Sequence, residues 1–145
     1  MGGMALRHPL TTFFATLALV PTEVAVRVVG LNPLYRSVGR LFRVQQRPGR
    51  TAADAASIAE AIARANARLR PRRAACLGRS LVTWAALRSH GYDADLRIGG
   101  RKEGDDFKAH AWVEWRGEPL AEPEDIQATY AAFPITHEHF GLGAG

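Results

Sequence analysis

The single cysteine of the chain, Cys76, stands in "RRAACLGRSL", between a basic stretch and a run with helical spacing. A thiol at the start of a helix meets free N–H groups and a partial positive charge, and both favour the thiolate. Arg72, Arg73 and Arg79 would add to this positive field, and the same N–H groups could hold an oxyanion. The position therefore predicts a nucleophile, and the alternative interpretation is a buried structural cysteine.

A candidate base lies in "FKAHAWVEW" (residues 107–115), where the alternation of apolar and polar residues predicts a strand. His110 falls on the polar face of this strand, together with Trp112 and Glu114. A strand packed on the cysteine-bearing helix would hold the imidazole near the sulfur, as nucleophilic catalysis by cysteine requires. The alternative is a histidine on a solvated sheet face.

A third group must orient the imidazole and stabilise the imidazolium. Glu122 lies 12 positions after His110, in a predicted short strand that follows the "RGE" reversal, so a hairpin would bring the two side chains together. Glu114 and Asp125 are competitors, although Glu114 lies four residues along the same strand, roughly 13 Å from His110. Any of these carboxylates could instead be simply solvated.

The elements that must position these residues are predicted to be helices first and strands afterwards. Helical spacing covers residues 10–29, 34–42, 53–69 and 76–90; strands are expected over 92–98, 107–115 and 119–122, and a short helix over 124–132. Thr51 or Asp54 would cap the third helix, and Gly91 would end the fourth. This order predicts an α+β fold, with a helical N-terminal part followed by a small antiparallel sheet.

The length and charge of the chain bound its class. Its 145 residues suggest one domain over 1–145, with an apolar helical part at 1–50 and a core at 51–135. The net charge of +5 hides an excess of arginine before residue 102 and of acidic residues after it. An acidic peptide or a nucleic acid could bind such a surface. The alternative is that the arginines form ordinary solvated surface and bind no partner. Because the arginines are dispersed and no nucleic-acid motif accompanies them, we expect no nucleic-acid partner.

The uncharged segment "PLTTFFATLALVPT" (residues 9–22) is too short to span a membrane as a helix. It could be part of a signal peptide, but no small-x-small cleavage site ends it. Otherwise it is an apolar helix that packs on the domain, on a partner or on a membrane surface. We therefore expect a bacterial cytoplasmic protein, with peripheral membrane contact through this helix as an option.

No cofactor or metal is expected. One cysteine excludes an intrachain disulfide and zinc sites of the Cys-x-x-Cys type. His137 and His139 form a His-x-His pair without a third ligand nearby, and the chain has no phosphate-binding glycine loop.

Two blocks of the chain, "CLGRSLVTWAALRSHGYDADLRIGG" and "FKAHAWVEWRGEPLAE", resemble the transglutaminase-like cysteine peptidases of lasso-peptide biosynthesis, the leader peptidases. The similarity covers about residues 72–123. It implies a papain-like or transglutaminase-like core with the nucleophile, Cys76, at a helix N-terminus, and with His110 as the base. The acid position falls on Glu122, where the family usually has Asp.

The resemblance also implies a substrate and partners. The substrate would be a ribosomally made precursor peptide whose leader is removed, and Arg73, Arg79 and Trp112 are the candidate substrate-binding residues. A small separate leader-recognition protein would present the precursor, since a chain of this length resembles the stand-alone type, and an ATP-dependent cyclase would use the product. The open alternatives are a non-catalytic precursor-binding module and an acyl transferase of transglutaminase type that uses the same three residues.

Overall fold

The structure, a computed structural model, describes residues 31–41, 44, 48–69 and 76–133. Its longer helices are α2 (Leu31–Leu41), α3 (Ala52–Leu69) and α4 (Cys76–Ser89). The helices predicted over 53–69 and 76–90 are thus confirmed, whereas the one predicted over 10–29 lies outside the described residues.

The ends of α3 and α4 follow from the local sequence. The backbone N–H of Asp54 donates to the Thr51 hydroxyl at 3.1 Å, so Thr51 caps α3. At the other end of α4, Gly91 has a φ of 83°, which a glycine adopts without steric cost. The Gly91 and Tyr92 N–H groups then bond back to the carbonyls of Arg88 and Leu87, closing the helix.

The strands form one antiparallel sheet in the order β3-β2-β1-β4. Their bounds are β1 Ala94–Glu103, β2 Asp106–Trp115, β3 Glu118–Pro119 and β4 Ala131–Ala132, with the short helix α5 (Ile126–Thr129) before β4. The predicted α+β class with a small antiparallel sheet is therefore confirmed. The helix expected over 124–132 is wrong in its extent, because the chain leaves α5 to pair with β1 at Gly99 and Gly100.

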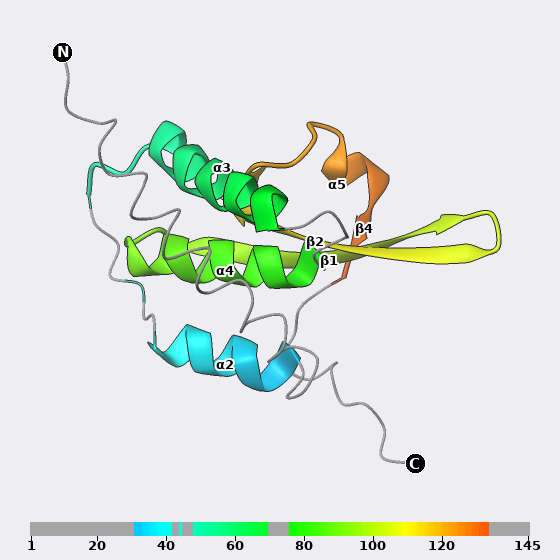
Figure 1. The fold of residues 1–145 in the computed structure, drawn as a ribbon, viewed down its shortest axis with the longest axis horizontal. Helices are drawn as coiled ribbons and strands as arrows, with labels where there is room; N and C mark the ends of the chain where they lie inside the picture. The colour runs from blue at the N-terminus through cyan, green and yellow to red at the C-terminus, as the bar shows by residue number, and fades with distance from the viewer. Residues whose placement is uncertain (1–30, 42–43, 45–47, 70–75, 134–145) are drawn as a thin grey trace.

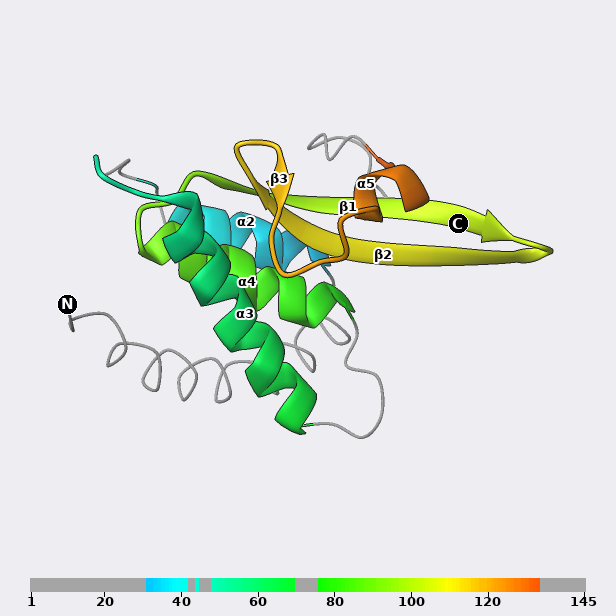
Figure 2. The same cartoon turned by 90° about the horizontal axis from the view of Figure 1, so that it is seen from above.

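Helix α4 packs against β1 and β2, and α2 and α3 flank it (Figures 1 and 2). Both views show the β1–β2 hairpin extending well beyond the helices. No helix among the described residues is long and apolar enough to cross a membrane.

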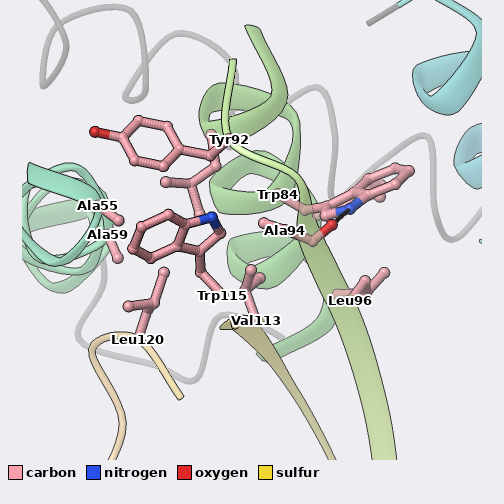
Figure 3. Packing of buried hydrophobic residues seen from close by; sticks show 11 residues of the cluster. Ala55, Ala59, Trp84, Tyr92, Ala94, Leu96, Val113, Trp115 and Leu120 are labelled. Atoms are coloured by element: carbon pink, nitrogen blue, oxygen red, sulfur yellow. Dashed lines mark hydrogen bonds between the residues drawn. The ribbon is translucent and has the colours of Figure 1, made fainter. Parts of the chain in front are cut away.

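The main core lies where α4 meets the base of the hairpin, and its largest side chains are the aromatic rings of Trp84, Tyr92 and Trp115 (Figure 3). The Trp84 indole N–H donates to the Ala94 carbonyl at 2.8 Å, which ties α4 to the start of β1. Tyr92 and Trp115 meet edge to face at 5.4 Å between ring centroids. Burial of these large rings helps to hold α4 against the two strands.

The second face of β2 is also buried at the C-terminal end of the strand, where a polar face could have been solvated. Trp112 and Glu114 are only 1% and 5% exposed, although they alternate with the core residues Val113 and Trp115. Alternation of apolar and polar residues predicts a solvent-exposed face of a strand only when no other element covers that face. Here Gln127, at α5, bonds to Glu114 and lies over that face.

We expect Gly99→Ala to lower the free energy of unfolding by about 1–3 kcal/mol. A Cβ at residue 99 would lie 2.8 Å from the Ala131 carbonyl oxygen and 2.9 Å from the buried Trp112 ring, and neither can move freely. Urea denaturation followed by tryptophan fluorescence measures the loss. Gly100→Ala is the matched control, since its Cβ would meet the ends of two exposed rings, Phe107 and Phe133, which can rotate away. Equal losses in the two variants would contradict this account.

Candidate active site

Cys76 is the first residue of α4, as predicted, and its side chain is half-buried. The sulfur therefore lies at the positive end of the helix. The backbone of Ala111 in β2 fixes this end of α4 against the sheet. Its N–H donates to the Cys76 sulfur, and its carbonyl accepts the Ser80 hydroxyl at 2.7 Å.

The His110 ring reaches both of its predicted partners. It hydrogen-bonds to the Cys76 side chain, and its Nε2 lies 3.0 Å from Oε2 of Glu122. Because Nε2 faces the carboxylate, Nδ1 is the ring nitrogen left for the sulfur. The structure thus brings Cys76, His110 and Glu122 together in a continuous line of contacts, from a helix start, a strand and the segment after β3.

Glu122 reaches the ring because of the turn that follows β2. Arg116 and Gly117 both have positive φ and reverse the chain into β3, which pairs with β2 at Glu114 and Trp115. The next contact is from the Leu120 N–H to the Val113 carbonyl, at 2.9 Å. Ala121 then adopts a φ of 54°, an uncommon conformation for a residue with a Cβ, and Glu122 follows directly. Strain of this kind is often retained at functional sites.

The electrostatics of the site favour a charged pair. Burial raises the pKa of the Cys76 thiol, but hydrogen bonds from His110 and Ala111, with the nearby charges of His110 and Arg79, outweigh it and lower the pKa below 9.0. The hydrogen bonds of His110 to Cys76 and Glu122 outweigh burial and raise its pKa from 6.5 to about 9. Near neutral pH both shifts favour thiolate and imidazolium, the form in which a cysteine nucleophile is active.

Trp112 is buried beneath the surface, at 1% exposed, and its predicted role in substrate binding stays a prediction. Its ring lies nearly parallel to that of His110, with centroids 6.3 Å apart, and its indole N–H donates to Glu114 at 2.8 Å. Arg97 and Gln127 also bond to the same buried carboxylate, at 3.0 and 2.8 Å. Trp112 is therefore a support beneath the imidazole, held in place by Glu114.

The two competing carboxylates, Glu114 and Asp125, hydrogen-bond to groups other than the imidazole of His110. Glu114 is bound to Arg97, Trp112 and Gln127, as described above. Asp125 is exposed, and its carboxylate accepts the Thr129 hydroxyl at 3.3 Å. Of the three candidates, Glu122 is the one with a hydrogen bond to His110.

Of the two arginines expected to bind substrate, Arg73 lies outside the described residues. Arg79 is described, and its guanidinium forms an ion pair with Oε1 of Glu122. The sequence could not show this pair, since 43 residues separate its members. Arg79 therefore has a contact within the site, and its expected contact with an acidic leader stays a prediction.

Two further residues of the site were not predicted from the sequence. Ser80 is 2% exposed and anchors α4 to β2. The signal in the sequence was a hydroxyl four positions after the cysteine, one helical turn along. Tyr130 lies against His110 with ring centroids 5.2 Å apart, and the Arg101 guanidinium lies 5.2 Å from the centre of the tyrosine ring. No pattern in the sequence indicated that the segment after α5 returns to the histidine.

The described part of the chain holds no group of three or more His, Cys, Asp or Glu side chains that could bind a metal ion. The pair His137 and His139 lies outside it. The chemistry that the described geometry supports is nucleophilic attack by a thiolate with a histidine as the proton carrier.

Comparison with known proteins agrees with this chemistry. A family model, Transglut_core3, described as the transglutaminase-like superfamily, matches residues 17–134, which is well over half of the chain. No curated protein and no solved structure gives a significant match.

Proposed function

The chain belongs to the transglutaminase-like superfamily, whose members are generally cysteine-protease-like enzymes, and from this premise we propose that it is a cysteine endopeptidase. Its substrate is a ribosomally made precursor peptide, from which it removes the leader during lasso-peptide maturation. The observation that carries the enzymatic part is the line of contacts from Cys76 through His110 to Glu122. The resemblance of the two sequence blocks to the leader peptidases supports the choice of substrate.

In the proposed reaction, the Cys76 thiolate attacks the carbonyl carbon at the junction of leader and core. The backbone N–H of Cys76 stabilises the oxyanion. His110 gives its proton to the leaving amine of the core peptide, which departs as the thioester of the leader forms. Water then attacks the thioester, His110 takes its proton, and the leader leaves with a free carboxylate. Glu122 orients the ring and stabilises the imidazolium throughout.

The proposal extends to partners and location. A small leader-recognition protein presents the precursor, and an ATP-dependent cyclase takes the freed core peptide. The chain acts as one domain over residues 1–145 in the bacterial cytoplasm, and its N-terminal apolar segment contacts a membrane or a partner.

Transfer of the leader to an amine, instead of to water, is a second candidate, because the family name covers acyl transfer and the same thioester would serve. The test incubates precursor, recognition protein and this chain in ¹⁸O-labelled water, with and without an added primary amine. Mass spectrometry of the leader then separates the outcomes. Hydrolysis labels the new carboxylate with ¹⁸O, transfer adds the mass of the amine, and an intact precursor contradicts both and leaves a binding module.

The pH dependence of cleavage tests the charged pair. Since the thiol has a lowered pKa and His110 has one of about 9, cleavage should persist below pH 9.0 and fall as the pH rises through about 9. The fall follows from loss of the His110 proton that the leaving amine needs. Alkylation of Cys76 by iodoacetamide needs only the thiolate and should not fall there. If cleavage instead rises through pH 9, as it would for an ordinary thiol, the assignment is overturned.

A further inference from the structure

The buried carboxylate of Glu122 has a second partner besides the histidine. Its side chain is 5% exposed, and its two oxygens are divided between two groups. Oε2 faces His110, and Oε1 is bound by the guanidinium of Arg79, itself 22% exposed. Arg79 lies one turn after Cys76 on α4, so both groups project from the same side of the helix.

The charge of His110 changes during the proposed reaction, whereas that of Arg79 does not. When the imidazole gives up its proton, a carboxylate this deeply buried would lose its compensating charge, and an uncompensated buried charge is strongly unfavourable. A guanidinium stays protonated throughout and holds a carboxylate in a fixed geometry. Arg79 therefore keeps Glu122 compensated and in place in those steps where the histidine is neutral.

We propose that Arg79 is a positioning residue for the reaction: it fixes the Glu122 carboxylate so that the remaining oxygen orients His110 towards Cys76. This inference rests on the proposed function for its substrate, but not for its geometry. It is an alternative to the expectation that Arg79 binds an acidic leader. The direct charge of Arg79 also contributes to lowering the pKa of Cys76, so removal of this arginine should weaken the nucleophile as well.

The test compares Arg79→Met, Arg79→Lys and the control Arg64→Met, which removes an equal charge from an exposed pair with Glu60 on α3. For Arg79→Met we expect kcat for precursor cleavage to fall by on the order of 10- to 100-fold, with KM unchanged. The pH at which cleavage is lost on the alkaline side should also change. Arg79→Lys should recover part of kcat, because lysine restores the positive charge but lacks the planar guanidinium group with its paired N–H donors. Arg64→Met should match the wild type in both parameters.

A double-mutant cycle separates positioning from substrate binding. In a Glu122→Gln background, Arg79→Met should cause a much smaller further loss than in the wild type, because its main partner is already altered. The cycle is measured both by cleavage and by the rate of Cys76 alkylation. A rise in KM with kcat intact, or equal losses in both backgrounds, would overturn the inference. If the wild type leaves the precursor intact, the proposed function fails, while coupling in the alkylation rates still decides the role of Arg79.

Discussion

Replacement of Cys76 by alanine is expected to abolish cleavage of the precursor, with a loss of about 10⁴-fold or more in kcat. Loss of the sulfur removes the atom that would form the thioester, and no other cysteine in the chain can replace it. The fold should survive, because the side chain is half-buried at a helix start and α4 is also held by the buried Ser80 hydroxyl.

The measurement is the yield of free leader by mass spectrometry, alongside circular dichroism to show that the variant is folded. Iodoacetamide provides a second readout, since the chain has one thiol and a single mass shift identifies its modification. Cys76→Ser is the closer variant in shape and should be almost as inactive, because a hydroxyl lacks the acidity of the thiol. Cleavage at the wild-type rate in either variant would exclude the thioester mechanism.

The second large effect is expected for Glu122→Gln, with kcat lower by about 10²- to 10⁴-fold. Glutamine keeps the size of the side chain but removes the negative charge that favours the protonated imidazole. The pKa of His110, now raised to about 9 by Cys76 and Glu122, should therefore move down towards 6.5. The fall in activity at alkaline pH should move to lower pH with it.

Two matched variants make this result specific. Glu118→Gln removes a carboxylate from an exposed position on β3, and Asp125→Asn tests the exposed competitor. Neither should change kcat or the position of the alkaline fall. A shifted pH profile in Asp125→Asn, with an unchanged one in Glu122→Gln, would transfer the role to the other carboxylate.

Much of the site could be predicted from local pattern. The start of α4 at Cys76 followed from helical spacing, and the place of His110 on a strand followed from alternation. The hairpin between His110 and Glu122 followed from a short reversal between two strands. Each of these inferences depends on neighbours close in sequence, where local preferences and periodicity act.

The parts that could not be predicted depend on contacts between distant segments. Trp112 was placed on a polar face that could be solvated, yet Gln127 and its neighbours bury that face around Glu114. The pairing of Arg79 with Glu122 joins a helix to the segment after β3. The return of the chain through β4, which brings Tyr130 to His110, has no local signature.

The division of the site between the start of α4 and the later hairpin has a consequence for the newly made chain. Synthesis delivers Cys76 before His110 and Glu122, and domains form from the segments that have already emerged. Until β2 and β3 dock on α4, the thiol lacks its base and behaves like that of free cysteine. A nascent or unfolded copy is therefore unable to cleave peptides in its surroundings, and the alkylation rate at neutral pH reports the fraction of molecules that have completed folding.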